Sequence, residues 1–387
     1  MKRQRAPLGD LCNLVKGTSP ISKTPPGPYP LVTTGEDHKT ADTFQFDAEA
    51  VCIPQISSTG HGHASLKRVH YQTGRFALAN LAVAAIVKDN SALSSPFLAR
   101  YLMFTKDRLI VPLMTGAANM SISIARLATI PIEFPPLAKQ ELIVKLLDEA
   151  DDLRNLRAVA DLRSADLVPA LFHEMFGCHI KSPPVMISLD SANAPNGWRW
   201  SRLSEVARLA TGHTPSRRVP EYWNGNIPWI SLTDIRALDG KVAQSTIQSV
   251  TEEGIENSSS VKLPKGTVCF SRTASVGFVT VMGREMCTSQ DFVNWVCGDK
   301  LDPTYLMGAL IQARGYLRSL ASGSTHKTIY FPTVERFCAL VPPLQQQKLF
   351  SKQVTEIRGL EADQAASSRR LEDLFQSLIH RAFRGEL

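Results

Sequence analysis

The side chains with the clearest chemistry in this chain are cations, amides and hydroxyls in segments rich in Gly, Pro, Asn and Ser. Groups of these types pair with phosphates and hydrogen-bond to base edges. In the second half of the chain the candidates are Thr214, Ser216, Arg217, Arg218, Trp223, Asn224, Asn226, Arg236, Arg272 and Lys327. In the first half they are Lys16, Thr18, Ser19, Lys23, Lys39, His61, His63, Lys67 and Arg68. We expect these residues to include a nucleic-acid interface, although any one of the cations taken alone is better explained as a solvated surface charge. The densest cluster is Arg217-Arg218 with Asn224 and Asn226.

Motifs for other chemistries are incomplete. The sequence has no G-x-x-x-x-G-K-[ST] phosphate loop and no G-x-G-x-x-G between a strand and a helix. The pair His61 and His63 has no third metal ligand spaced for it, and the carboxylates at 149–152 fit the polar side of an amphipathic helix. The seven cysteines contain no C-x-x-C pair, which is typical of reduced thiols in a cytoplasm. We therefore expect no catalytic, cofactor-binding or metal site in this chain.

Length and composition describe an ordinary globular chain of two or three domains. The chain has 387 residues, of which 43% are hydrophobic and 20% charged, and this excludes disorder of the whole chain. No apolar run approaches the ~18 residues of a membrane span, and the first residues lack the apolar segment of a secretory signal. We expect a cytoplasmic protein.

The net charge of +7 is distributed unevenly. Residues 1–135 hold 14 Lys and Arg against 9 Asp and Glu, and residues 199–343 hold 16 against 12. Residues 136–180 are acidic, with 5 against 8. Chance can produce such a pattern, but it is also typical of two basic modules that meet a polyanion.

An internal repeat organises the chain. At an offset of 207 residues, residues 96–176 align without a gap with residues 303–383. The upstream parts match more loosely, with Gly17 over Gly212 and residues 29–32 over 227–230. A tandem duplication whose upstream parts have diverged predicts one scaffold that carries two different surfaces.

Each repeat is predicted to be a compact α+β part followed by a helical tail. Apolar runs bounded by turn residues predict strands over 50–56, 227–232, 266–272 and 292–297, and one short helix over each of 96–113 and 303–320. Trp229 is expected to pack in the core. After each Pro-Pro pair, apolar residues recur in steps of three, four and seven, which predicts a helix of ~40 residues and ~60 Å.

The two tail helices could each lie on their own domain. Because their apolar faces share one register, we instead expect them to pack on each other as an antiparallel, coiled-coil-like spacer with pseudo-two-fold symmetry. Pro169 is expected to kink the first helix near its end.

The repeated motifs occur in the same order in both halves. The second half contains LATGHTPSR (209–217), NIPWISLTDI (226–235) and FPTVERFCALVPPLQQQKLF (331–350). The first half contains VKGTSP (15–20), TGAANMSISI (115–124) and PIEFPPLAKQELI (131–143). With these motifs, almost the whole chain resembles the specificity subunit of type I restriction-modification systems.

The resemblance implies two target-recognition domains and two helical spacers. The boundaries are 1–135 for the first recognition domain, 136–180 for the central spacer, 181–343 for a connector with the second recognition domain, and 344–387 for the C-terminal spacer. Each recognition domain would read half of a bipartite, asymmetric DNA sequence through the major groove. Arg272 aligns with Gln55 and Lys327 with Met120, so these positions would read different bases in the two domains.

The resemblance also implies partners for a subunit that is not itself an enzyme. The spacers would dock two methyltransferase subunits, which use S-adenosylmethionine to methylate adenine. Motor-nuclease (restriction) subunits would add ATP- and Mg²⁺-dependent cleavage, in the host defence of a bacterium or archaeon. Two alternatives stay open: the specificity subunit of another bipartite-cutting restriction system, and an assembly scaffold whose basic blocks bind protein or RNA.

Overall fold

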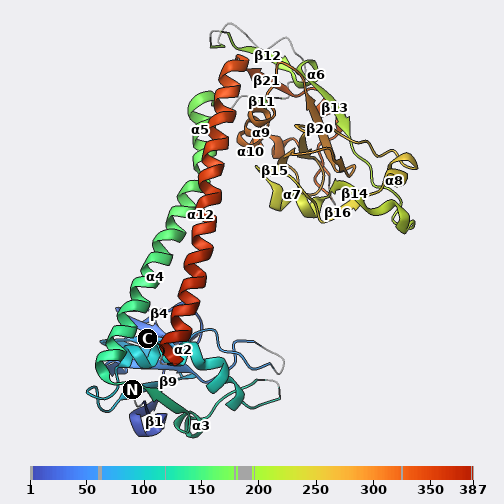
Figure 1. Ribbon diagram of the computed structural model, residues 1–387. Coiled ribbons are helices and arrows are strands. Elements are labelled where there is room, and N and C mark those ends of the chain that lie inside the picture. The colour runs from blue at the N-terminus through green and yellow to red at the C-terminus, as the bar shows by residue number, and fades with distance from the viewer. Residues whose placement is uncertain are drawn as a thin grey trace. The chain divides into compact units, whose positions relative to one another are not determined.

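The structure, a computed structural model, describes residues 3–59, 63–117, 119–177, 180–181, 194–195, 197–323, 326–384 and 386. The chain divides into two compact units, which are residues 1–158 with 366–387 (unit 1) and residues 159–365 (unit 2). Two long helices, α4 (Leu137–Ala165) and α12 (Leu344–Arg384), each contribute a segment to both units (Figure 1). Among the described residues, no helix combines the length and apolar character that a membrane crossing requires.

Unit 1 is built on two four-stranded sheets and one strand pair. The first sheet has the order β2 (Cys12–Lys16), β9 (Ala82–Val87), β6 (Ala50–Pro54) and β7 (His70–Gln72). The second has the order β4 (Lys39–Ala41), β3 (Tyr29–Val32), β8 (Arg75–Leu78) and β5 (Phe46–Asp47), and β1 (Gln4–Pro7) pairs with β10 (Pro131–Phe134). The helices of its globular part are α1 (Leu8–Leu11), α2 (Ser95–Leu109) and α3 (Ile124–Ala128), with a 3₁₀ turn at Val111–Leu113.

Unit 2 repeats this plan with additions. Its largest sheet has the order β13 (Ala207–Thr211), β20 (Phe292–Cys297), β17 (Val268–Ser271), β18 (Val279–Met282) and β15 (Val242–Ala243). A second sheet has the order β16 (Gln248–Val250), β14 (Trp223–Ile230) and β19 (Cys287–Thr288). A third has the order β11 (Ile180–Lys181), β21 (Cys338–Val341) and β12 (Arg199–Arg202). The helices are α5 (Leu167–Phe176), α6 (Leu203–Val206), α7 (Leu232–Leu238), α8 (Glu252–Glu256), α9 (Pro303–Gln312), α10 (Arg314–Ser319) and α11 (Phe331–Val334), with a 3₁₀ turn at Pro220–Tyr222.

The sequence prediction of strands and one helix per globular part was incomplete. The strand predicted over 227–232 ends at Ile230, because Ser231 caps helix α7 instead of continuing the strand. The Ser231 hydroxyl accepts from the backbone of Asp234, and the Asp234 carboxylate accepts from the backbone N–H of Ser231 at 3.0 Å. This S-x-x-D capping box was a readable helix signal that the strand pattern obscured.

The tail helices differ in continuity. Helix α12 runs unbroken for 41 residues, whereas α4 ends at Ala165 and α5 begins at Leu167. Pro169 has no N–H to bond the carbonyl of Ala165, and its ring collides with that carbonyl in a regular helix. The regular helix is therefore interrupted at Asp166, three residues before the proline that was expected to kink it.

Within each unit, segments of the two tails contact each other, and in unit 1 they run antiparallel. In unit 1, Arg154 pairs with Glu372 at 2.8 Å, and Arg157 Nε donates to Ser368 Oγ at 3.1 Å, so the numbering rises along one helix as it falls along the other. In unit 2, the ring of Phe350 on α12 lies 5.4 Å from that of Phe172 on α5. The expectation of an α+β chain with a long helix after each globular part is confirmed.

The duplication extends to individual hydrogen bonds. Ile122 N–H donates to the carbonyl of Gln55 at 2.8 Å, and Ile329 N–H, 207 residues later, donates to that of Arg272 at 2.9 Å. The looser upstream match is also confirmed, because Leu31 and Val32 pair in parallel with β8 as Trp229 and Ile230 pair with β19. The two units therefore share one backbone frame.

Candidate nucleic-acid interface

A glycine opens the candidate loop after the first long strand of each unit. A Cβ on Gly212 would lie 2.1 Å from the carbonyl oxygen of Thr288, and a Cβ on Gly17 would lie 2.1 Å from that of Ala79. Only glycine allows this close approach, which presses the loop against the turn that follows β19 in unit 2 or β8 in unit 1. The hydroxyl residues Thr214 and Ser19 follow two positions after their glycines.

In unit 2 this loop belongs to a chain of polar contacts. Thr214 Oγ1 donates to Gln290 Oε1 at 2.5 Å, and Arg272 Nη2 donates to the carbonyl of Gln290 at 3.0 Å. The Arg272 guanidinium lies 4.9 Å from the ring centroid of Phe331, and its burial lowers its pKa. Arg272 is thus half-buried and partly engaged, while Thr214 and Gln290 lie beside it.

Two further cations flank this chain of contacts. The carbonyl of Lys327 accepts from Ala274 N–H at 3.0 Å, and its ammonium side chain is exposed. Arg236 on α7 is exposed and donates from Nη2 to Ser275 Oγ at 3.2 Å. The structure therefore gathers Thr214, Arg272, Lys327 and Arg236 from four separate segments.

Arg217 lies on an aromatic platform. Its guanidinium carbon is 4.4 Å from the ring centroid of Trp223 and 5.4 Å from that of Trp229. Trp229 is 2% exposed, as expected for a core residue. Trp223, predicted as a DNA contact, forms the outer face of the platform, and its indole N–H donates to the carbonyl of Ser216 at 3.2 Å.

The other members of the densest predicted cluster are exposed. Asn224 has a φ of +63°, which asparagine tolerates better than most residues. Gly225 is pressed against the carbonyl of Val250 and separates Asn224 from Asn226. Arg218 is exposed, and only its backbone N–H is engaged, with Ser216 Oγ at 3.4 Å, among the hydrogen bonds of the described chain.

In unit 1, the predicted residues fall into two groups. Thr18 donates from both its N–H and its hydroxyl to Gln45 Oε1, and Gln45 Nε2 donates to the carbonyl of Lys16 at 2.8 Å. Ser19 bridges in parallel to Ala79 on the same edge. Lys23 and Lys39 are exposed elsewhere on the unit.

The second group lies on the segment before β7. The carbonyl of His63 accepts hydroxyl hydrogen bonds from Ser57 and Thr59, which shape the segment around it. Lys67 and Arg68 are exposed, and His61 lies outside the described residues.

A histidine pair lies close to Arg68. The rings of His38 and His70 are 4.7 Å apart, and His70 Nε2 is 2.7 Å from the carbonyl of Gly35. Burial lowers the pKa of His70; the hydrogen bond to Gly35 opposes this effect, and the charges of His38 and Arg68 add to it. Desolvation and Arg68 likewise lower the pKa of His38, while Asp37 raises it.

This pair predicts a loss of unit 1 stability on acidification. Below the ordinary histidine pKa of 6.5, His70 is protonated in the unfolded chain but stays largely neutral in the folded chain, where its pKa is lowered. Because the unfolded chain then binds more protons, the free energy of unfolding falls as pH falls from 7 to 5. As pH falls, the rate of amide hydrogen exchange in peptides from residues 63–87 should therefore increase relative to that of an unstructured reference peptide. The substitution His70→Gln should reduce that pH dependence, and an undiminished dependence would assign it to other groups.

Several residues of the interface were missed from the sequence. Gln45, Gln248 and Gln290 each hold a predicted residue in place through a side-chain hydrogen bond. Gln290 lies in the polar run 288–291 between two predicted strands, a signal that was available. Gln45 and Gln248 lie in no comparable polar run, and their partners are 27 and 31 residues away in the sequence.

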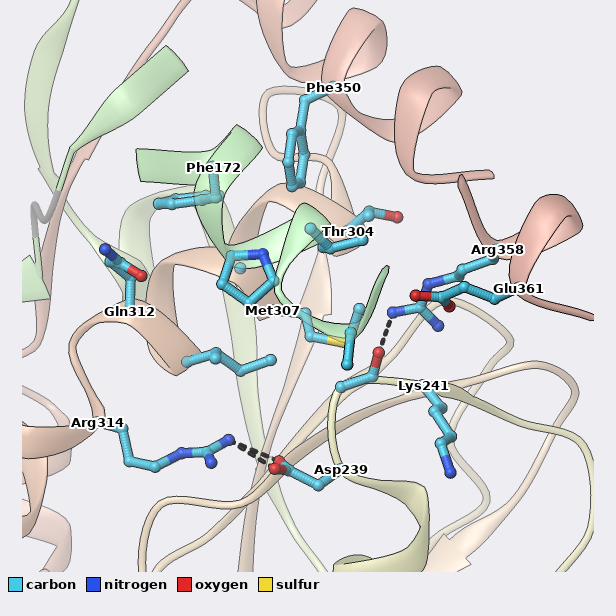
Figure 2. A pocket seen from close by; sticks show the side chains of 16 residues that line it. Phe172, Asp239, Lys241, Thr304, Met307, Gln312, Arg314, Phe350, Arg358 and Glu361 are labelled. Carbon is cyan, nitrogen blue, oxygen red and sulfur yellow. Dashed lines mark hydrogen bonds and ion pairs between the residues drawn. The ribbon is translucent and has the colours of Figure 1, made fainter. Parts of the chain in front are cut away.

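Unit 2 also contains a cavity of about 400 Å³, and none of the predicted residues lines it (Figure 2). Phe172, Met307 and Phe350 contribute apolar walls, Arg314 pairs with Asp239, and Arg358 donates to the carbonyl of Gly240. The residues of unit 1 that align with Met307 and Arg358 are Arg100 and Asp151, which form an ion pair. The two lining positions occupied by Met307 and Arg358 in unit 2 therefore carry a different pair of side chains in unit 1. Within the described ranges, no group of three or more His, Cys, Asp or Glu could hold a metal ion.

A sequence profile described as the type I restriction modification DNA specificity domain matches the chain twice, over residues 4–158 and 195–360. The chain belongs to this family. Two curated relatives are the type I restriction enzyme MjaIX specificity subunit of Methanocaldococcus jannaschii and the HindI specificity subunit of Haemophilus influenzae. The first is 28% identical over 164 residues, which cover 41% of this chain and 38% of the relative. The second is 24% identical over 196 residues, which cover 50% and 42%. The chain thus aligns with less than half the length of either relative.

The fold is similar to that of solved members of the family. The S subunit of a type I restriction-modification system from M. genitalium aligns over 98% of this chain and 96% of its own, with a TM-score of 0.58 and 15% identity. Together with the family match, this likeness confirms the resemblance inferred from the motifs.

Proposed function

We propose that this chain is the specificity subunit of a type I restriction-modification system, without a catalytic site of its own. It recognises a bipartite, asymmetric DNA sequence and directs methyltransferase and restriction subunits to it. The proposal follows the predicted division, with recognition domains in 1–135 and 181–343 and helical spacers in 136–180 and 344–387. The observation that carries it concerns the candidate DNA-contacting loops, which we call the recognition edge of each unit. The two edges share one backbone arrangement but carry different side chains at equivalent positions.

The edges of the two units differ at four equivalent positions. The hydrogen bond from Gln55 N to Leu81 O at 2.8 Å in unit 1 corresponds to that from Arg272 N to Asp291 O at 2.9 Å in unit 2, so Asn80 is the equivalent of Gln290. The unit 1 edge thus carries Ser19, Gln55, Asn80 and Met120, and the unit 2 edge carries Thr214, Arg272, Gln290 and Lys327. A neutral edge and a cationic edge present different donors and acceptors, so the half-sites they read differ in sequence.

The tails carry a second duplicated surface, which supports docking of two copies of one partner. Leu142, Lys145, Glu149 and Leu153 recur unchanged as Leu349, Lys352, Glu356 and Leu360. The four leucines are between 50% and 64% exposed. The buried neighbours Ile143 and Leu147 change instead to Phe350 and Val354.

The exposed residues of the two tail helices are thus identical, whereas their buried neighbours differ. Packing alone would constrain the buried residues more than the exposed ones. Residues 11 apart on a helix share a face, so each leucine pair flanks its Lys–Glu pair on one side. We propose that each surface binds one methyltransferase subunit. This chain itself binds no cofactor: S-adenosylmethionine is bound by the methyltransferase subunits, and ATP and Mg²⁺ are bound by the restriction subunits.

The test is adenine-methylation sequencing of a host that expresses this chain with the methyltransferase subunit encoded beside it. We expect methylation in one sequence with two specific parts separated by a fixed gap. Methylation without sequence preference would contradict the proposal.

The scaffold alternative makes the opposite prediction for DNA. We expect the double variant Arg217→Ala with Arg218→Ala to weaken duplex binding while methyltransferase docking is kept. Unchanged duplex binding in that variant, with docking intact, would favour the scaffold. A specificity subunit of another bipartite-cutting system is distinguished by the enzymes that its neighbouring genes encode.

A further inference from the structure

The guanidinium of Arg217 contacts three side chains on the surface of unit 2, those of Trp223, Trp229 and Gln248. Trp223 lies 4.4 Å beneath it, and the two indole rings of the platform meet edge to face with centroids 5.1 Å apart. Each indole is itself fixed, because Trp223 Nε1 donates to the carbonyl of Ser216 and Trp229 Nε1 donates to that of His213 at 3.0 Å. A guanidinium stacked on such a platform has little freedom to rotate.

A hydrogen bond to Gln248 further restricts the rotation of the Arg217 guanidinium. Arg217 Nη2 donates to Gln248 Oε1 at 3.0 Å, and Gln248 is the register partner of Trp229 across the β14–β16 pair. The side chain of Arg217 is nonetheless exposed. Its other guanidinium donors have no hydrogen bond to any described residue, so they are available to an outside acceptor pair.

We propose that Arg217 is a specificity-determining residue that reads a guanine in the half-site recognised by unit 2. This inference rests on the proposed function. A fixed planar fork matches the O6 and N7 acceptors of guanine in the major groove. A phosphate contact needs charge but no fixed plane, and a flexible lysine provides that equally well.

Unit 1 lacks this arrangement at the equivalent positions, which gives the inference an internal control. The position of Trp229 is occupied by Leu31, which pairs with β8 in the same register. Ser22, five residues after Gly17, takes the place of Arg217, five residues after Gly212. Loss of the guanine contact therefore affects one half of the bipartite sequence and leaves the other unchanged.

The experiment compares Arg217→Lys with Arg284→Lys in the complete complex with methyltransferase. Both variants keep the charge and both residues are exposed, but Arg217 lies over the ring of Trp223, whereas Arg284 is outside the predicted DNA contacts. We expect Arg217→Lys to lower the preference for one G·C pair by about 10- to 100-fold. Preference at every other position, and in Arg284→Lys, should stay as in the wild-type complex.

Trp223 supplies a second variant for the same test. Removing the stacking ring in Trp223→Leu should relax the same base pair, and the aromatic replacement in Trp223→Phe should restore most of the preference. The far-ultraviolet circular dichroism and melting temperature of each variant confirm that it is folded. Recovery in Trp223→Phe separates a positioning role from a general loss of structure.

Three results would overturn the inference. An unchanged methylation sequence in Arg217→Lys shows that Arg217 reads no base. Equal weakening for all sequences, with a smaller dependence on salt, assigns it to a phosphate. Loss of base preference in the half-site read by unit 1, and not in that read by unit 2, would contradict the assignment of Arg217 to the unit 2 half-site. Failure of the proposed function is a different result, because the wild-type complex itself would then show no sequence preference.

Discussion

Replacing Gln347 with leucine is expected to lower the free energy of unfolding of unit 2 by about 3–5 kcal/mol. Gln347 is fully buried at the start of α12. Its Oε1 accepts from Asp302 N–H at 2.8 Å, and its Nε2 donates to the carbonyls of Lys300 at 3.2 Å and Pro342 at 2.8 Å. Leucine fills the space but leaves all three main-chain groups without a partner.

Tryptophan fluorescence during urea unfolding measures this effect selectively. All five tryptophans of the chain lie in residues 198–295, inside unit 2. The matched control is Gln346→Leu at the exposed neighbouring position, which should change stability by less than about 0.5 kcal/mol. A loss below about 1 kcal/mol in Gln347→Leu would show that the three hydrogen bonds are replaceable.

The same arrangement occurs in unit 1. Gln140 Oε1 accepts from Ser94 N–H, and Gln140 Nε2 donates to the carbonyls of Ala92 and Pro135, each at 2.8 Å. These glutamines connect the N-terminus of α2 or α9 to the start of a tail helix, so they set the direction in which each tail leaves its globular part. A direction fixed by buried hydrogen bonds is what the proposed spacer between two half-sites would require.

Glutamate at position 153 or 360 is expected to remove one of the two methyltransferase copies from the complex. Leu153 and Leu360 are equivalent exposed leucines, 55% and 64% exposed, on the two surfaces that we propose dock the methyltransferase. Burying a carboxylate where a leucine should be buried weakens that copy's binding by about 10- to 100-fold or more. Light scattering should give a complex with one copy for Leu153→Glu or Leu360→Glu, and no bound copy for the double variant.

The control for these variants is Leu162→Glu. Leu162 is 72% exposed, but 20 residues after Leu142 it points to the opposite side of a regular helix, and its repeat equivalent is Arg369. It therefore lies outside the duplicated surface, and its substitution should leave both copies bound. A double Leu153→Glu and Leu360→Glu variant that still binds two copies would refute docking on these surfaces.

Local patterns carried the prediction of the helices. The tail helices were predictable because apolar periodicity and the Pro-Pro starts act over a few residues, and the break before Pro169 follows from the proline ring alone. Helix α7 was missed because the apolar run through Trp229 and Ile230 suggests a strand that continues past Ser231. The capping box formed by Ser231 and Asp234 ends that strand, and side-chain hydrogen bonds of this kind outweigh weak strand propensity.

The sequence by itself determined the duplication, the α+β units with long tails, and the family, because these depend on order and spacing along the chain. The tertiary structure alone decided which side chains meet. Gln248 reaches Arg217 across 31 residues, and Gln290 reaches Thr214 across 76. No local propensity encodes such approaches, because they depend on strand register and on glycines that let loops touch. The sequence thus named Arg217 as one cation among many. Only the folded chain placed it against two tryptophans, with one guanidinium donor bonded to Gln248 and no further hydrogen bond to a described residue.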